Sequence, residues 1–259
     1  MKQTFFITGT DTGVGKTVLT VLLAQFLRER GVNAAALKPI CSGGRGDAKK
    51  IFAAMSGAFE VQNPKSKVQS LLLSLDEINP WHFRAPIAPL LSARKENKRV
   101  KLSQVLAHAR TMQKRFDILL IEGAGGLLSP LGVCSGGLRP SQSSALTERR
   151  YKENFDSRDL ILALRAIPII VAQNKLGVVN QVLLTLEALP KNLRAKTRVV
   201  LMSPSKPDVS TKTNAKLLAE FAKTKKIFQL PWLGKNAGTI RILKNLRVRR
   251  TLGLLASGI

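Results

Sequence analysis

The stretch GTDTGVGKT, residues 9–17, follows the apolar run TFFIT and precedes the apolar, helix-forming stretch VLTVLLAQFL. Its last three residues, GKT, match the end of the P-loop, a glycine-rich turn whose backbone N–H groups bind phosphate. In the usual P-loop the first glycine stands five residues before the second. Here that position is Thr10, and the nearest upstream glycine is Gly9. The loop is therefore one residue longer than usual, and the extra residue needs a chemical reason.

The rest of the chain alternates short apolar, β-branched runs with segments of helical periodicity. This alternation predicts a parallel sheet with helices on both faces, whose strands are apolar throughout because both sides are covered. We therefore expect a single α/β domain of the P-loop type over residues 1–259. The expected strands are 4–8, 34–37, 118–121, 167–172, 199–202 and 227–230, and the expected helices are 18–30, 47–55, 102–114, 179–189 and 214–223.

Two segments do not fit a regular element. Residues 79–91, NPWHFRAPIAPLL, contain three prolines and cannot form one continuous helix. Residues 131–155 are polar and rich in Gly and Ser, which predicts a long loop between two strands. Loops longer than about 15 residues in compact domains are usually functional or disordered.

The composition is strongly basic, with 42 Lys and Arg against 16 Asp and Glu and a formal net charge of +26. Such a charge indicates either attraction to nucleic acid or acidic lipid, or simply a solvated basic surface. The basic residues are spread along the whole chain and aromatic residues are only 5%, so we favour the solvated surface and expect no specific nucleic-acid site.

The sequence also predicts where the protein resides. Its two cysteines are too few for a disulfide framework, which favours a reducing cytoplasm. No apolar run approaches the roughly 20 residues that span a bilayer, so we expect no membrane association. The N-terminus begins with a strand-like run, unlike a signal peptide.

The first candidate site is the P-loop with the start of the following helix. Loop N–H groups and a helix N-terminus together favour anions. Lys16 is expected to reach the β- and γ-phosphates of ATP, and the Thr17 hydroxyl to bind Mg²⁺. The nucleotide contacts expected here are Gly13, Val14, Gly15, Lys16, Thr17 and Val18.

The second candidate site is the stretch KPICSGGRGD. Lys38 directly follows an expected strand, Ser42 lies close by, and Asp47 begins the next expected helix. Ligands of open parallel sheets bind at the carboxyl ends of the strands, which is also where the P-loop lies. A second cation at that edge could offset charge that develops during phosphoryl transfer, although an isolated lysine after a strand is often only solvated.

The third candidate site is the stretch DILLIEGAGGLLSP. Glu122 follows an apolar run, the usual position of the acid linked to Mg²⁺ in nucleotide-hydrolysing folds. The glycines after it allow backbone N–H groups to approach a ligand closely. Oxygens of Thr17, Asp47 and Glu122 would suit Mg²⁺, with substrate phosphates completing its coordination shell.

Four other residues carry weaker signals. His82 and His108 are far apart and have no acidic or cysteine neighbour in the sequence, so we predict neither a metal site nor a catalytic triad. Cys41 is interpreted as a small packing residue. Trp232 could flank a nucleotide base or simply pack, and the residues alone leave both interpretations open.

Taken together, the motifs resemble those of the dethiobiotin synthetase family. GTDTGVGKT, KPICSG, INPWHFRAPIAPLLSAR, EGAGGLLSPL, NKLGVVNQVLLT and LPWLG occur in that family's order and cover nearly the whole chain. The resemblance implies an enzyme that must place a second substrate, and not only water, against the γ-phosphate. This accounts for the longer loop.

The resemblance also implies a reaction. An amine of 7,8-diaminononanoate takes up CO₂ as a carbamate, the carbamate attacks the γ-phosphate of ATP, and the second amine closes a ureido ring. Thr12, Lys16, Lys38 and Ser42 would surround the carbamate and the γ-phosphate, with Thr12, Lys16 and Lys38 catalytic.

Further contacts follow from the same resemblance. The backbone after Glu122 would receive the substrate, which would complete its carboxylate site across a homodimer interface in the cytoplasm. The positions involved are Gly125 and Gly126 for the substrate, Asp47, Glu122, Gly123, Ala124, Gly125, Pro231, Trp232 and Leu233 for ATP, and Thr17, Asp47 and Glu122 for Mg²⁺.

The chain departs from the family pattern in three places. Residues 132–154 look like an insertion, Ser203 stands where an amide side chain is expected, and residues 235–238 lack the expected acid. Two other classes share features of this chain. A partitioning-type ATPase could bind DNA through the basic surface, but its P-loop opens with KGG. A corrinoid amidotransferase would need a further glutaminase domain with a Cys–His pair.

Overall fold

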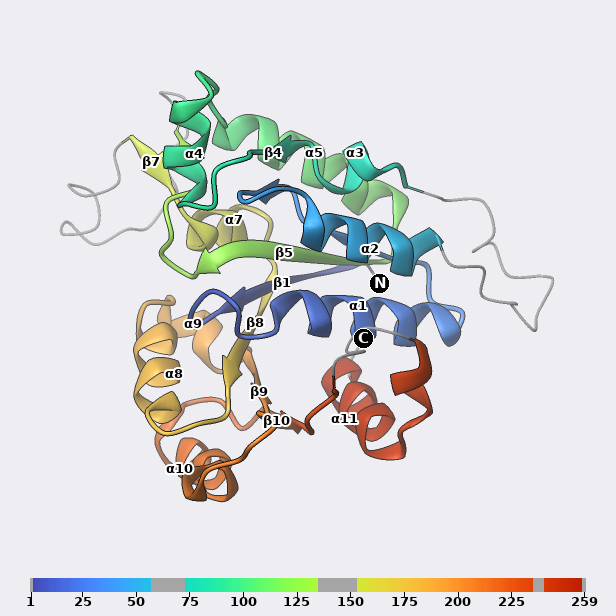
Figure 1. Ribbon diagram of the computed structural model, residues 1–259, viewed down its shortest axis with the longest axis vertical. Coiled ribbons are helices and arrows are strands. Elements are labelled where there is room, and N and C mark those ends of the chain that lie inside the picture. The colour runs from blue at the N-terminus through green and yellow to red at the C-terminus, as the bar shows by residue number, and fades with distance from the viewer. Residues whose placement is uncertain (1, 57–72, 135–152, 235–239, 258–259) are drawn as a thin grey trace.

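A computed structural model describes residues 2–56, 73–134, 153–234 and 240–257 of the chain (Figure 1). Its centre is a six-stranded sheet in the order β10–β9–β8–β1–β5–β2, in which every neighbouring pair is parallel. The strands are β1 (Gln3–Gly9), β2 (Ala34–Leu37), β5 (Ile118–Gly126), β8 (Ile167–Gln173), β9 (Arg198–Met202) and β10 (Ile227–Leu230). All six expected strands are confirmed.

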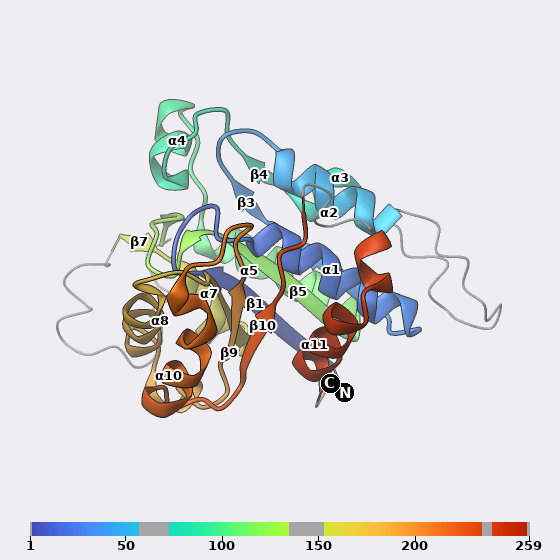
Figure 2. The ribbon, with the colours of Figure 1, turned by 60° about the horizontal axis from the view of Figure 1, so that its bottom comes forward.

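The sheet is covered by helices on both faces, as the apolar strands require (Figures 1 and 2). Right-handed crossovers from β1 to β2 and from β8 to β9 run in opposite directions along the sheet, so their helices lie on opposite faces. One face carries α1 (Lys16–Glu29), α2 (Gly46–Ser56) and α11 (Leu246–Ala256). The other carries α5 (Leu102–Arg115), α7 (Ser157–Ala163), α8 (Val178–Glu187) and α10 (Asn214–Phe221).

The core is continuous through both layers. Phe5, Phe6 and Ile7 of the central strand β1 have no exposed surface, and the strands beside them are equally apolar. Burial on both faces is what allows these strands to lack polar alternation. The predicted fold class, a P-loop-type parallel sheet with helices on both faces, is confirmed.

Several short elements were not predicted. They are β3 (Ile40–Cys41), α3 (Leu75–Ile78), β4 (Trp81–His82), α4 (Pro89–Lys95), α9 (Lys191–Arg194) and the 3₁₀ turns η2 (Val209–Lys212) and η3 (Ile240–Lys244). The helices α7 and α11 were also missed. As expected, residues 79–91 form no continuous helix, because β4 lies within them and α4 begins only at Pro89.

The expected long loop at residues 131–155 is closed at its base. β6 (Gly132–Val133) pairs antiparallel with β7 (Asn154–Phe155). Residues 135–152 lie outside the described part of the chain, so the suggested insertion at 132–154 stays a prediction. Among the residues that the structure describes, no helix is long and apolar enough to span a bilayer.

Because all six strands are parallel, their carboxyl ends meet at one edge of the sheet. The P-loop leaves β1 there, Lys38 follows β2, and Glu122 lies in the last half of β5. β5 neighbours both other strands, so the three candidate sites of the sequence are brought side by side. Ligands of such folds bind at this edge.

Candidate active site at the carboxyl ends of the central strands

The P-loop has the backbone conformation that its glycines allow. Gly13 and Gly15 have positive φ angles of 73° and 103°, which side-chain-bearing residues rarely adopt. Gly15 is the N-cap of α1, so the helix begins at Lys16 and aims its free N–H groups at the loop. The loop therefore has the anion-binding geometry expected from the sequence.

Two residues of the longer loop hold Lys16 in place. The Lys16 Nζ donates a hydrogen bond of 2.7 Å to the backbone oxygen of Asp11, and the Asp11 side chain accepts 2.6 Å from the N–H of Thr12. Thr12 itself is exposed, and Val14 is buried beneath the loop. The importance of Asp11 was missed in the sequence, because its main contact uses a backbone atom.

Lys38 lies between two carboxylates. Its Nζ is 2.5 Å from Glu122 Oε1 and 3.1 Å from Asp47 Oδ2. The side chains of Lys38 and Glu122 are almost wholly buried, whereas that of Asp47 is 46% exposed. The lysine is therefore not a solvated strand-end residue, and the structure unites it with both acids that the sequence assigned to the site.

Glu122 also connects this cluster to the P-loop. The Thr17 hydroxyl donates a 2.7 Å hydrogen bond to the same Oε1 atom that contacts Lys38. The second oxygen, Oε2, is buried and has no hydrogen-bond partner among the residues that the structure describes. β5 continues past the expected end at Ile121 to Gly126, so Glu122 lies inside the strand and not after it.

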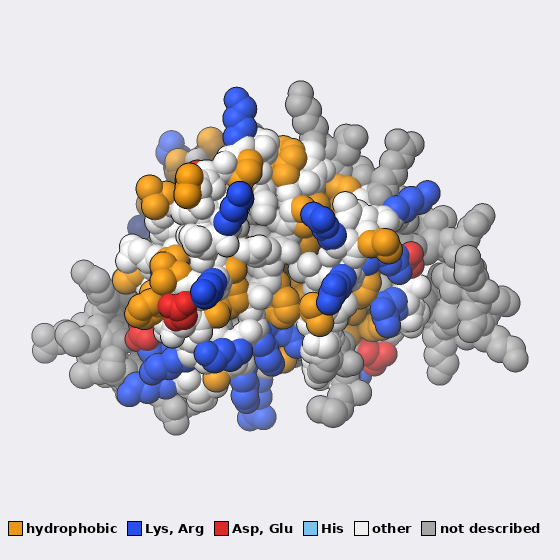
Figure 3. Space-filling model, turned by 90° about the horizontal axis from the view of Figure 1, so that it is seen from below, with side chains coloured by type: hydrophobic (Ala, Val, Ile, Leu, Met, Phe, Trp, Pro, Cys, Tyr) orange, Lys and Arg blue, Asp and Glu red, His pale blue; other side chains and the backbone are white. Residues whose placement is uncertain are grey.

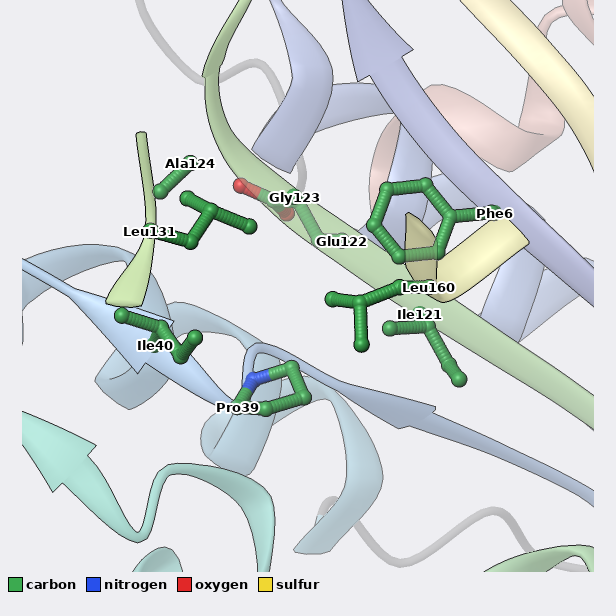
Figure 4. A pocket seen from close by; sticks show the side chains of 9 residues that line it. All are labelled: Phe6, Pro39, Ile40, Ile121, Glu122, Gly123, Ala124, Leu131 and Leu160. Atoms are coloured by element: carbon green, nitrogen blue, oxygen red, sulfur yellow. The ribbon is translucent and has the colours of Figure 1, made fainter. Parts of the chain in front are cut away.

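A small pocket lies beside Glu122 (Figure 4). Apolar side chains from β1, β3, β5 and α7 line it, among them Phe6, Ile40, Ile121 and Leu160. An apolar lining lowers the local dielectric constant and so strengthens the attraction between Glu122 and the Lys38 ammonium. The Thr17 hydrogen bond and the short contact with Lys38 hold the carboxylate beside the P-loop.

The charged groups of the cluster shift one another's pKa values. Burial alone would lower the pKa of Lys38, but Glu122 and Asp47 overcome it and raise that pKa to about 12. Burial, followed by the nearby charge of Lys38, lowers the pKa of Lys16 to about 8. Burial would raise the pKa of Asp47, yet the ammonium of Lys38 holds it below its ordinary value. Lys38 is thus the firmly protonated cation of the pair.

The oxygen donors of the cluster are suited to Mg²⁺. Glu122 Oε1 and Asp47 Oδ2 already converge on one cation, the Lys38 ammonium, and Glu122 Oε2 is an orphaned buried acceptor. A hydrogen bond from Thr17 also acts on Asp47, so the hydroxyl lies within reach of both acids. Hard carboxylate and hydroxyl oxygens are the ligands that Mg²⁺ prefers. The residues present therefore fit the metal.

The glycines after Glu122 lie beside the start of the P-loop. Gly126 is paired with Gly9 in the sheet, and its backbone N–H donates a 3.0 Å hydrogen bond to the Ser129 hydroxyl oxygen. Gly125 has a φ of 69°, which makes the sharp turn at the end of β5 possible. Gly123 and Ala124 complete the strand. These residues line the strand end between the P-loop and the β6–β7 ladder.

The remaining nucleotide candidates follow β10, on the far side of β1 from Lys38. Pro231 and Leu233 are half-buried, and Trp232 is 56% exposed. Next to β10, the side chain of Met202 at the end of β9 lies within 3.1 Å of where a Cβ on Gly15 would be. This contact was missed, since no sequence signal joins Met202 to the P-loop. Ser203 follows it, half-buried.

Ser42 lies on the loop between β3 and α2 and is half-buried. The chain just before it, residues 38–41, is bound to a residue that no sequence motif singled out as functional, Asn79. Its side chain has no exposed surface and donates a 2.7 Å hydrogen bond to the backbone oxygen of Lys38. The motif INPWHF contains this asparagine, but nothing in the sequence joins it to Lys38, 41 positions earlier.

Known proteins were compared with the chain. A family model described as an AAA domain matches residues 3–134. The ATP-dependent dethiobiotin synthetase BioD of Thermodesulfovibrio yellowstonii is 33% identical over 235 residues, which is 90% of each chain. The enzyme of the same name from Bacillus velezensis is 30% identical over 229 residues, covering 85% of this chain and 83% of the relative.

Solved structures share the fold at lower similarity. A ParA family ATPase from Chlorobium tepidum is 11% identical with a TM-score of 0.51, covering 98% of both chains. The MinC:MinD cell division complex of Aquifex aeolicus is 13% identical with a TM-score of 0.52, covering 98% of this chain and 95% of the other. These likenesses concern the fold alone. The sequence matches over nearly the full length, by contrast, place the chain in the family of ATP-dependent dethiobiotin synthetases.

Proposed function

We propose that the protein is an ATP-dependent dethiobiotin synthetase that converts 7,8-diaminononanoate, CO₂ and ATP into dethiobiotin, ADP and phosphate. The observation that carries the proposal is the buried Lys38, placed between Asp47 and Glu122 beside the P-loop. Lys38 supplies a second ammonium at this edge, in addition to that of Lys16. A carbamate that must attack the γ-phosphate carries negative charge, and this ammonium would stabilise it.

The proposed reaction has three steps. The substrate amine adds to CO₂ and loses a proton, giving a carbamate. A carbamate oxygen attacks the γ-phosphorus, the bond to the ADP oxygen breaks, and a carbamic–phosphoric anhydride forms. The second amine then attacks the carbamate carbon and phosphate leaves, which closes the ureido ring. Most of the catalysis in such transfers is positioning together with stabilisation of developing charge.

The chain's own residues would divide this work. The P-loop N–H groups and Lys16 bind the β- and γ-phosphates, and Lys38, Thr12 and Ser42 surround the carbamate. Lys16 must leave the Asp11 carbonyl, and Lys38 must turn from the carboxylates toward the ligand. Both lysine side chains are long and unbranched, so they can rotate toward the ligand at a lower free-energy cost than a movement of the loop would require. The backbone of Gly125 and Gly126 would receive the substrate chain.

Mg²⁺ would be held by Thr17, Asp47 and Glu122, and it would neutralise charge on the phosphate oxygens when bound. The nucleotide would further contact Gly123, Ala124, Pro231, Trp232 and Leu233. Ser203 offers a single hydroxyl oxygen, which donates or accepts at one point, where a side-chain amide would present a carbonyl acceptor and an NH₂ donor side by side. We therefore expect weaker discrimination among nucleotide bases than an amide at this position would give.

We also propose a homodimer that acts in the cytoplasm. In the stretch NKLGVVNQVLLT, Leu176 just before α8 is 80% exposed and Leu184 in the second half of α8 is 63% exposed. A two-fold contact is the commonest assembly, and these exposed leucines would form it.

The decisive experiment is the assay for the product. Purified protein is incubated with 7,8-diaminononanoate, bicarbonate, Mg²⁺ and ATP, and dethiobiotin is sought by mass spectrometry. The proposal requires dethiobiotin and ADP in equal amounts. Phosphate release without a ureido product, increased by added DNA, would instead favour a partitioning-type ATPase. The solved ParA family structure shares only 11% sequence identity with this chain, and so it does not support that alternative.

A further inference from the structure

Asn79 lies at the C-cap of α3, behind the segment that carries Lys38, Ser42 and Asp47. Its side chain has no exposed surface. The Nδ2 group donates 2.7 Å to the Lys38 carbonyl oxygen and makes longer contacts of 3.4 Å with the carbonyls of Pro39 and Trp81. The amide thus holds the chain where it leaves β2.

The other end of the same amide holds the start of α2. Asn79 Oδ1 accepts 3.2 Å from Arg45 Nε and 3.2 Å from the Cys41 thiol. Three carbonyls surround the nitrogen and two donors face the oxygen, so the hydrogen-bond network itself defines which end is which. Arg45 also donates 3.1 Å to the Asn79 backbone oxygen and 2.8 Å to that of Leu75.

This arrangement spans both ends of the loop between two active-site side chains. Lys38 begins the segment, and Arg45 precedes α2, whose first turn carries Asp47. Backbone hydrogen bonds tie the remainder to the same partner segment, from Lys38 to Ile78 and from Gly44 to Phe83. The buried amide is therefore the one side chain in the described structure that bonds directly both to the Lys38 end and to the Arg45 end.

We propose that Asn79 is a positioning residue of the active site, whose buried amide sets the placement of Lys38 relative to Asp47. The proposal rests on the roles given above to those two residues. Asn79 makes none of its hydrogen bonds with Lys16, Thr17 or Glu122, and acts through the Lys38 backbone and the side chains of Arg45 and Cys41. A misplacement of about 1 Å in such machinery costs on the order of 10²-fold in rate.

The test uses two substitutions of Asn79. Asn79→Ala removes both the hydrogen bond to the Lys38 carbonyl and the one from Arg45. Asn79→Asp keeps an acceptor for Arg45 but presents a carboxylate oxygen to the Lys38 carbonyl. We expect kcat to fall about 10²-fold in each, by the misplacement argument. The affinity for an ATP analogue should change less than about threefold, because the P-loop is not bonded to Asn79.

A matched control distinguishes positioning from lost stability. Thr224→Val removes a fully buried hydroxyl that donates 2.6 Å to the Thr197 carbonyl, near the starts of β9 and β10 and away from the active site. Its melting temperature should fall by an amount similar to that of the Asn79 variants, while kcat stays near the wild-type value. Arg45→Gln, which loosens only the Asp47 end, should lose about tenfold in kcat, less than the loss expected from misplacement at both ends.

A direct structural readout completes the test. A crystal structure of ligand-free Asn79→Ala should show the Lys38 Nζ to Asp47 Oδ2 distance changed from 3.1 Å. Near-normal kcat in both Asn79 variants would overturn the proposal, and so would a kcat loss in Thr224→Val as large as theirs at a similar fall in melting temperature. If the wild-type protein makes no dethiobiotin, the proposed function fails instead, and the crystallographic distance still decides whether Asn79 positions Lys38.

Discussion

At the residue scale, Lys38 is a cation that two carboxylates hold ready at the carboxyl edge of the sheet. Burial works against its charge, and Glu122 and Asp47 more than compensate. A compact ammonium can leave such a site and approach a ligand on its flexible stem, whereas a guanidinium presents a rigid planar fork. Charge and mobility together suit a group that must meet a newly formed anion.

Lys38→Ala should reduce kcat for dethiobiotin formation by about 10²–10³-fold, because a positioned donor of this kind acts mainly in the transition state. Lys38→Arg should fail as well, since a planar fork does not replace a compact ammonium that must turn toward the carbamate. Nucleotide affinity, measured by calorimetry, should be largely retained, because Lys16 and the loop backbone are untouched. Near-normal turnover in Lys38→Ala would remove the residue from the mechanism.

The contact between Lys38 and Glu122 also predicts a stability effect in the ligand-free protein. Glu122→Gln leaves a buried ammonium with only the half-exposed Asp47, and should destabilise the fold by about 3–5 kcal/mol. Lys38→Met in that background should recover much of the loss. Urea unfolding of the two single variants and the double variant gives the coupling energy. Strict additivity of the two changes would contradict the proposed pairing.

At the element scale, the strands could be predicted and several helices could not. A strand buried on both faces is visible as a continuous apolar run, as in β1 and β8. In the sequence, the basic run RVRR hides the apolar pattern of α11. Its buried residues are Val248, Leu252 and Leu255, and they form a buried helix face only because α1 packs against them. Tertiary packing supplies most helical stability, and a single sequence does not display it.

In the candidate site, too, some residues could be predicted from the sequence and others could not. Lys16, Thr17, Lys38 and Glu122 were predictable because each stands next to a strand end that the apolar runs revealed. Asn79 was not, because one polar residue in a proline-rich stretch acquires meaning only when residues forty positions earlier fold against it. Sequence spacing therefore locates the residues at strand ends. It does not identify the distant residue whose hydrogen bonds hold a strand end in position.

The N-terminus of α7 predicts a pH-dependent stability. Burial, and then the neighbouring carboxylate of Asp156, raise the pKa of Asp159 from 3.8 to about 6. Because the folded-state pKa is raised, the stabilisation by the proton is complete below about pH 4 and is lost as the pH rises through 6. Asp159→Asn should therefore stabilise the protein by about 1 kcal/mol at pH 8, after allowance for solvent screening.

The measurement for Asp159 is urea unfolding of wild type and variant between pH 4 and pH 8. The asparagine can still accept the 2.9 Å hydrogen bond from the Asp156 N–H, so the helix cap is kept. Glu220→Gln, at an exposed position on α10, serves as the control and should change stability little at any pH. A gain that is equally large at pH 4 would show that the carboxylate charge is not its cause.

At the scale of the whole molecule, the proposed dimer can be tested through its exposed leucines. Leu176→Asp should weaken self-association and lower specific activity on dilution, because a charge would be buried in the contact. Leu254→Asp on α11, where the leucine is 53% exposed on the opposite layer, should do neither. Sedimentation equilibrium and activity against protein concentration provide the readouts. A wild-type monomer with full activity at high dilution would exclude the dimer.

The basic charge is the other property of the whole molecule. Lys and Arg side chains are spread over the face seen in Figure 3, with few acidic ones between them. Binding to duplex DNA should therefore be non-specific and driven by counterion release. Six to ten phosphate contacts would cost about 10³–10⁵-fold in affinity between 50 and 200 mM salt. Fluorescence anisotropy with two unrelated sequences measures this, and sequence-selective binding that survives physiological salt is the contrary result.

The position of β1 in the sheet has a consequence for how the chain is made. Gln3 at the start of β1 pairs with Ile118, and Phe5 pairs with Ile167 on the other side. At about 5–20 residues per second, a ribosome needs many seconds to deliver either partner after β1 has emerged. During that time the apolar run around Phe5 has no neighbouring strand, and pairing across such sequence separations is intrinsically slow. β1 thus waits for both of its neighbouring strands, and this apolar run is exposed to aggregation, or to capture by chaperones, until β5 and β8 arrive.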